Sequence, residues 1–325
     1  MTLKKQKFGR THLRVSELCL GTSNFARYAD QEESFAILDA FREAGGNFFQ
    51  TSGICPGVSL GDGFLGMPEE LLGRWLRDRK VNRGSFAIAT RLALTRPIIG
   101  GLETYTDLIR GCVEDSVRRV GCGFLDFLVV EWTDAILPLP ERVAAFEAIV
   151  SSGEVRHIVP ANFPSYHVLE ALAASRREPG VFAGLQLDYS LAVRSKFEAI
   201  AERICVDRGL AAIARSPLAG GHLANRSLTS SGGALNAGRG RHTAMTTDGL
   251  WPVLSAIARS QRVSFAQVAL AWVLAHPQIT SVLISVSSVD QLRELFGATR
   301  LSLTEIEINR LGGGPHCKAA ETLSA

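Results

Sequence analysis

A short apolar run at residues 126–132, Asp-Phe-Leu-Val-Val-Glu-Trp, carries a carboxylate near its end and is the first candidate for chemistry. A run of this length, preceded by Gly121 and Gly123, is typical of a parallel strand buried on both faces. Glu131 then stands where the strand ends, and in an α/β barrel this position faces the active-site mouth. We expect Glu131 to act as a general acid or base. The alternative is a structural ion pair, in which Arg91 neutralises the buried carboxylate.

Two arginines close other predicted strands, Arg91 after residues 86–90 and Arg215 after residues 210–214. Guanidinium groups bind carboxylate and phosphate oxygens through several N–H donors. The pair could therefore hold a substrate carboxylate, phosphate or enolate oxygen. Alternatively, both side chains extend from the strand ends to solvent.

Gln50 and Cys55 complete the candidate catalytic residues. Gln50 ends another predicted strand and is interpreted as a hydrogen-bonding wall of the pocket. Cys55 lies in a glycine-rich loop at 52–66. No histidine is close to it in sequence, which favours an inert thiol over a nucleophile.

Alternating strand and helix patterns predict how these residues are positioned. The expected strands are 18–22, 47–50, 86–91, 126–132, 155–159, 181–186, 210–214 and 281–284, with predicted helices between them. This α/β pattern predicts a single (β/α)8 TIM barrel over residues 1–325 with an N-terminal β-hairpin at 3–16. A doubly wound open sheet is disfavoured because the first strand lacks a Gly-x-Gly-x-x-Gly turn.

The composition argues against several classes of function. Lys and Arg number 35 against 32 Asp and Glu, a balance that gives no electrostatic footprint for nucleic acid or an acidic membrane. No apolar run approaches the roughly 20 residues that span a bilayer, and the basic start has no apolar segment typical of a signal peptide after it. The six cysteines form no Cys-x-x-Cys pair. We expect reduced thiols, no zinc site and a cytoplasmic protein.

Several motifs resemble those of the aldo-keto reductase family over nearly the whole chain. They are FGRTHLRVS at 8–16, LGT at 20–22, GGNF at 45–48, LLGRW at 71–75, IAT at 88–90, GEVR at 153–156, NF at 162–163, SPLAGG at 216–221 and DQLRE at 290–294. The resemblance implies the same barrel, with NADP(H) lying across the strand mouths and a small-molecule substrate beside it.

The resemblance also implies an atypical catalytic site. Members of the family use an aspartate, a tyrosine, a lysine and a histidine as a proton-donating tetrad. The matching positions here are Gln50, Cys55, Arg91 and Glu131. Ketone reduction needs an acid at the carbonyl oxygen, and a tyrosine can serve when a neighbouring lysine lowers its pKa. Arginine stays protonated and cannot shuttle a proton, so Glu131 becomes the candidate acid.

Positions matching the family's cofactor site are partly retained. Asn162 and Gln186 match residues that hold the nicotinamide amide, and Ser216 and Leu218 match the pyrophosphate segment. The remaining matches are Thr22 near the first strand end and Ser287, Gln291 and Glu294 around the adenosine phosphate. Arg215 replaces the aromatic residue that stacks on the nicotinamide ring. For these polar residues, ordinary strand-end and loop-capping hydrogen bonds are the alternative role.

Three functional hypotheses follow. The first is an enzyme on the reductase scaffold that catalyses dehydration, elimination, isomerisation or cyclisation of a small oxygenated metabolite, with Glu131 as acid or base. The second is an NADPH-dependent carbonyl oxidoreductase with Glu131 as proton donor. The third is a non-catalytic protein that still binds the nucleotide.

Overall fold

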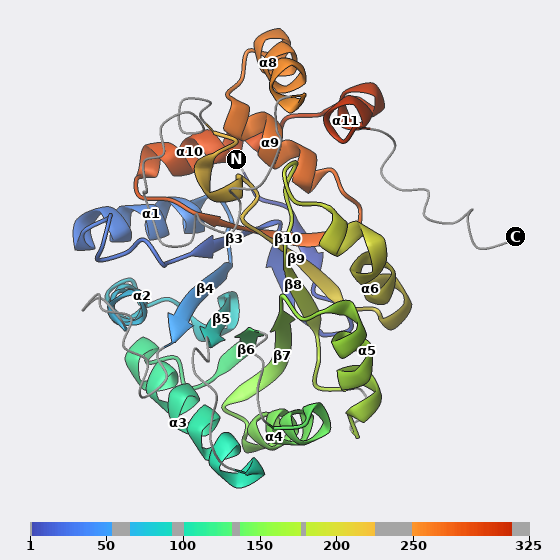
Figure 1. The fold of residues 1–325 in the computed structure, drawn as a ribbon. Coiled ribbons are helices and arrows are strands. Elements are labelled where there is room, and N and C mark those ends of the chain that lie inside the picture. The colour runs from blue at the N-terminus through green and yellow to red at the C-terminus, as the bar shows by residue number, and fades with distance from the viewer. Residues whose placement is uncertain are drawn as a thin grey trace, which may run out of the picture.

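The structure is a computed structural model that describes residues 2–53, 66–92, 101–131, 137–176, 180–224 and 249–313. Within these residues, parallel strands close a barrel in the order β10-β3-β4-β5-β6-β7-β8-β9 (Figure 1). The strands are β3 Leu18–Gly21, β4 Phe48–Gly53, β5 Ala87–Leu92, β6 Leu125–Glu131, β7 Val155–Ala161, β8 Gly184–Asp188, β9 Ala211–Arg215 and β10 Ile279–Ser285. The expected (β/α)8 barrel is confirmed.

Helices surround the barrel, as Figure 1 shows. They are α1 Gln31–Glu43, α2 Met67–Asp78, α3 Leu102–Val120, α4 Leu139–Ser152, α5 Ser165–Ala174, α6 Glu202–Arg208, α8 Leu250–Gln261, α9 Phe265–Leu274, α10 Val289–Ala298 and α11 Glu305–Leu311. Several begin with side-chain caps that satisfy first-turn N–H groups, among them Asp30 before α1 and Ser264 before α9. None of the helices in the described ranges is long and apolar enough to cross a bilayer.

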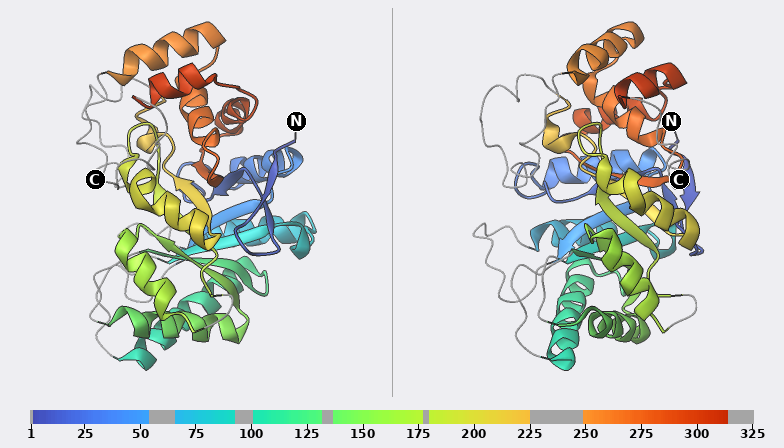
Figure 2. Two further views of the ribbon diagram at one scale, coloured as in Figure 1. Left: turned by 90° about the vertical axis from the view of Figure 1, so that its right-hand side faces the viewer. Right: turned by 45° about the vertical axis from the view of Figure 1, so that its right-hand side comes forward.

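The N-terminal hairpin, β1 Lys5–Lys7 and β2 Arg14–Ser16, lies at one end of the barrel (Figure 2). Phe8 from its turn is buried against Phe127 and Phe48, with ring centroids 4.2 and 5.9 Å away. Gly9 follows at φ +53°, and a Cβ there would lie 2.5 Å from the carbonyl oxygen of Ala183. Only glycine fits this approach, so the sequence lets the hairpin close the amino end of the barrel with an aromatic plug.

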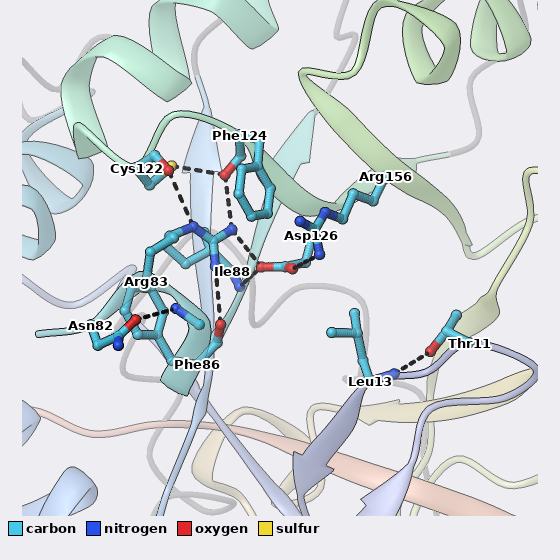
Figure 3. A network of polar contacts seen from close by, with 11 residues as sticks. Thr11, Leu13, Asn82, Arg83, Phe86, Ile88, Cys122, Phe124, Asp126 and Arg156 are labelled. Carbon is cyan, nitrogen blue, oxygen red and sulfur yellow. Dashed lines mark hydrogen bonds and ion pairs between the residues drawn. The ribbon is translucent and has the colours of Figure 1, made fainter.

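An ion pair fixes the strands at that same end (Figure 3). Asp126, at the start of β6, accepts hydrogen bonds from Arg83 Nη2 at 2.7 Å and from the backbone N–H of Ile88 at 2.9 Å. The Arg83 guanidinium also donates to the carbonyl oxygens of Cys122, Phe86 and Phe124. Contacts at the amino end of such a barrel serve stability, whereas residues at the carboxyl end serve chemistry.

Asp126→Ala should lower the free energy of unfolding by about 3–5 kcal/mol, because it leaves a half-buried guanidinium without its carboxylate. Urea unfolding followed by circular dichroism measures this loss. Asp107→Ala is the matched control, since it breaks an exposed pair with Arg110 and should cost less than about 1 kcal/mol. Equal losses in the two variants would contradict the role given to Asp126.

Candidate functional site

Charged side chains gather at the carboxyl ends of four strands. Arg91 is next to last in β5, while Glu131, Asp188 and Arg215 are the last residues of β6, β8 and β9. Carboxyl ends of parallel strands meet at the same mouth of a barrel, so residues far apart in sequence come together. The sequence predicted Arg91, Glu131 and Arg215 at strand ends, and the structure brings them into one cluster.

Glu131 lies between the two arginines. Arg91 Nη2 donates to Glu131 Oε2, and Arg215 Nη1 lies 3.9 Å from Glu131 Oε1. Asn162 Nδ2 lies 3.4 Å from the same Oε1. The side chain of Glu131 is only 13% exposed. The ion pair with Arg91, which the sequence offered as an alternative role for Glu131, therefore forms.

Asp188 anchors Arg215 and was missed by the sequence analysis. Its Oδ1 accepts from Arg215 Nε at 2.7 Å and its Oδ2 from Arg215 Nη2 at 3.0 Å. The sequence predicted a strand at 181–186, whereas β8 runs over Gly184–Asp188. Side chains two residues apart in a strand share a face. Extending the strand by two residues would therefore have placed Asp188 beside Gln186.

Arg91 is held in an environment that disfavours its charge. Burial lowers its pKa, the nearby positive charge of Arg215 acts in the same direction, and Glu131 opposes both. Its Nε is buried and has no hydrogen-bond acceptor. A buried donor without an acceptor is costly, so the guanidinium has capacity for a further ligand oxygen.

Gln50 and Gln186 meet across the barrel. They lie on β4 and β8, which are four strands apart in either direction around the closed barrel. Gln186 Nε2 donates to Gln50 Oε1 at 2.7 Å, and Gln50 Nε2 lies 3.4 Å from Gln186 Oε1. Both side chains are buried. The two amides satisfy each other, which leaves Gln186 less available for a nicotinamide amide than the resemblance implied.

A cavity of about 550 Å³ opens beside Arg91 and Arg215. Its lining includes Gln50, Arg91, Arg215, Ser216, Leu218, Gly220, Gly221, Ser287, Gln291, Glu294 and Leu295. Most of the residues predicted to bind the cofactor are therefore on one continuous surface with Arg91 and Arg215, whereas Glu131 and Asp188 lie behind these arginines and are not part of the lining. Thr22, Asn162 and Gln186 are not part of that lining. Thr22 is fully buried and donates its backbone N–H to the Gln50 carbonyl oxygen at 3.0 Å.

Two turns at the mouth have unusual backbone geometry. Asn162 and Ser216, each following a strand, have φ of 55° and 53°. Non-glycine residues in this region are uncommon and concentrate at functional sites. Asn162 Oδ1 is buried without a hydrogen-bond partner. An unmatched acceptor next to the charged cluster is the kind of group that an amide N–H₂ of a ligand satisfies.

The start of α10 forms another part of the lining. The Ser287 N–H donates to Gln291 Oε1 at 2.8 Å, and the Asn24 amide donates to Ser287 Oγ at 3.2 Å. The backbone N–H of Val289, in the first turn of α10, donates to Glu33 Oε1 at 2.7 Å. An anion normally favours a helix N-terminus, and here a carboxylate of the protein already provides one.

The chain has four tyrosines, and none lines the cavity. Tyr28 and Tyr166 are exposed, and Tyr105 is buried in α3. Tyr189 is buried with its hydroxyl donating to Glu198 at 2.8 Å, and burial raises its pKa above the ordinary range. No lysine of the described residues lines the cavity either. Cys55 lies outside the described residues, and within them no cluster of His, Cys, Asp or Glu could hold a metal ion.

A buried network behind β4 and β5 supports the mouth. Glu69, from the first turn of α2, accepts from Arg119 Nε at 2.6 Å and from the Thr51 hydroxyl at 3.2 Å. Thr51 and Thr90 are paired in register and their hydroxyls are 2.9 Å apart. Because alternate side chains face opposite sides of a strand, this outward network fixes the residues adjacent to Gln50 and Arg91.

Comparison with known proteins identifies the family to which this barrel belongs. The model of the Aldo/keto reductase family matches residues 17–313. The chain belongs to this family, which supports an oxidoreductase-type enzyme.

Similar proteins cover nearly the whole chain. "Uncharacterized oxidoreductase YrpG" of Bacillus subtilis is 33% identical over 317 residues, 93% of this chain and 93% of the relative. Norsolorinic acid reductase B of Aspergillus parasiticus is 28% identical over 320 residues, 92% of this chain and 80% of the relative. The crystal structure of thermostable aldo-keto reductase Tm1743 with the inhibitor epalrestat has a TM-score of 0.73 and 23% identity, over 96% of this chain and 99% of that one. It supports the fold.

Glu69 should give the protein a pH-dependent stability. Burial raises its pKa above 4.5, although Arg119 acts in the opposite direction. Its contribution to the free energy of unfolding is therefore present below pH 4.5 and is lost as the pH rises through the folded-state pKa. In Glu69→Gln this dependence disappears, so the variant's free energy of unfolding minus that of wild type should increase between about pH 4.5 and 7. Urea unfolding at several pH values measures the difference. The exposed Glu70→Gln should show no trend, and a decreasing difference for Glu69→Gln would mean that the Arg119 pair dominates.

Proposed function

We propose that the protein is an NADP(H)-dependent oxidoreductase that acts on a small oxygenated substrate at the barrel mouth, with Glu131 as proton donor. One observation carries the proposal. A single cavity joins Arg91 and Arg215 to the Ser216–Gly221 turn and to Ser287 and Gln291. Several positions that match the family's cofactor site thus share a cavity wall with Arg91 and Arg215, which supports hydride chemistry beside these two arginines. This reverses the order of the hypotheses drawn from the sequence.

The residues present fit a nicotinamide dinucleotide in most respects. Asn162 Oδ1 is a buried acceptor without a partner, which suits the carboxamide of a nicotinamide. Ser216 and Leu218 line the cavity beside Gly220 and Gly221, where backbone can approach a pyrophosphate closely. The Glu33 carboxylate at the Val289 N–H is the feature that fits a phosphate least well. A bound NADP(H) would supply the hydride.

The protein's own groups would then control the substrate oxygen. Arg91 has a buried Nε without an acceptor, and a guanidinium so placed can hold a negatively charged substrate oxygen. Among the residues that the structure describes, no tyrosine and no lysine lines the cavity. Glu131 is the carboxyl group in contact with both arginines, and therefore our candidate to deliver the proton.

A second candidate is non-redox chemistry: dehydration, elimination, isomerisation or cyclisation. The observation that favours it is the ion-paired state of Glu131. A carboxylate can abstract a proton, and Arg91 and Arg215 can stabilise the enolate that results. Here the nucleotide would take no part in turnover.

Nucleotide titration separates these candidates from a non-catalytic binding protein. We expect NADPH fluorescence and the melting temperature to change on binding, and NADPH to be oxidised when a carbonyl substrate is added. Substrate conversion without loss of NADPH absorbance would support the non-redox candidate. Tight binding with no conversion of any carbonyl compound tested would support the non-catalytic one. NADH, titrated in parallel, tests the effect of Glu33.

Glu131→Gln should reduce kcat by about 10²–10⁴-fold, the usual contribution of a positioned acid or base. The amide keeps the size of the side chain, so the circular dichroism spectrum should stay unchanged. Glu70→Gln, an exposed glutamate on α2, is the matched control and should retain full activity. Wild-type turnover in Glu131→Gln would refute the assignment.

A further inference from the structure

We propose that Arg91 and Arg215 form a subsite for a substrate carboxylate, and that the Glu131 carboxylate occupies it until the substrate displaces it. The inference rests on the proposed function, because it names the substrate class: small carbonyl compounds that carry a carboxylate group. It also accounts for how an ion-paired glutamate becomes able to donate a proton.

The geometry around Glu131 is that of an occupied anion site. One guanidinium contacts Oε2, and the other lies 3.9 Å from Oε1. Asn162 Nδ2 approaches Oε1 at 3.4 Å. A substrate carboxylate presents the same two oxygens in the same plane. Its two oxygens can therefore take the places of Glu131 Oε1 and Oε2. The substrate reaches the arginines from the cavity, because both arginines line it.

The arginines are arranged so that the exchange leaves them in place. Arg215 is fixed by two hydrogen bonds to Asp188, which do not involve Glu131. Arg91 has a buried Nε without an acceptor. A ligand oxygen that reaches this N–H removes the cost of the unmatched donor. A substrate carboxylate whose oxygen accepts from Arg91 Nε thus gains a hydrogen bond that Glu131 does not make.

The charges at the mouth determine what happens to Glu131. Among the described residues around it, the charged groups are Arg91 from β5, Asp188 from β8 and Arg215 from β9. With Glu131 ionised, two positive charges balance two negative ones. An incoming carboxylate adds one negative charge to a half-buried cluster. A buried carboxylate that loses its cationic partners is driven to its neutral form. Glu131 therefore takes one proton from water, which restores the charge balance among these described groups and the bound carboxylate.

Displacement thus converts Glu131 into the acid that the reaction needs. A bound NADPH would supply the hydride to the carbonyl carbon, so that the electron pair of the C=O π bond moves to the carbonyl oxygen. Glu131 then transfers its proton to that oxygen. The product is a hydroxy acid, and Glu131 is again a carboxylate able to return to the arginines as the product leaves.

Isothermal titration calorimetry tests the inference independently of turnover. Phenylglyoxylate is the probe, and its uncharged amide is the matched control ligand. Titrations are run near pH 7 in two buffers of different ionisation enthalpy, without nucleotide and again with oxidised NADP. Wild type should bind the acid at least about tenfold more tightly than the amide, with uptake of about one proton. Arg91→Gln and Arg215→Gln should each remove most of this preference, and Glu70→Gln should retain it.

Glu131→Gln gives the sharpest outcome. It should bind phenylglyoxylate more tightly than wild type, because the resident anion is gone, and it should take up no proton. Equal affinity for acid and amide, binding without proton uptake in wild type, weaker binding in Glu131→Gln, or no binding under either condition would each overturn the inference. Failure to oxidise NADPH with carboxylate binding intact would instead reject the redox function and leave the subsite standing.

Discussion

Neutralisation of buried charge is the constraint on which the mouth of this barrel depends. Arg91, Glu131, Asp188 and Arg215 are all largely shielded from water, and isolated charges in such a place are very costly. Each one persists because the others are within reach. Within the described residues, the cavity beside this mouth is lined by two of its arginines and by no lysine or tyrosine. Under the proposed function, activity and stability depend on the same contacts.

The rest of the fold holds those contacts in place. Buried ring packing and the Arg83–Asp126 pair fix the amino end of the barrel. Toward the other end, the Glu69–Arg119 pair holds the outward faces of β4 and β5. The Gln50–Gln186 amides span the interior just beneath the charged cluster. The two ends thus have different tasks, since one closes the barrel and the other presents polar groups to a cavity.

Strand ends were predictable from the sequence, and contacts across the barrel were not. The apolar runs that stop at Arg91, Glu131 and Arg215 place those residues at the mouth, because burial on both faces ends where the loop begins. Asp188 was missed since the predicted strand stopped two residues early. The Gln50–Gln186 pair depends on closure of the barrel, which brings opposite strands together and leaves no local pattern. Thr22 was assigned to the cofactor by resemblance alone; it is buried and does not line the cavity, so its cofactor role stays a prediction.

The choice of arginine over lysine decides which group at the mouth can change its protonation. A lysine can lose its proton and pass the effect to a neighbouring tyrosine, whereas a guanidinium remains charged throughout the physiological range. Burial and Arg215 lower the pKa of Arg91, and Glu131 acts in the opposite direction. Under the proposed function, the proton therefore comes from a carboxyl group and not from a guanidinium. Asp188 accepts two hydrogen bonds from one guanidinium, and neutralising it would weaken both of these bonds to Arg215. Among the described residues, Glu131 contacts both Arg91 and Arg215, so another anion that takes its place can keep both arginines paired.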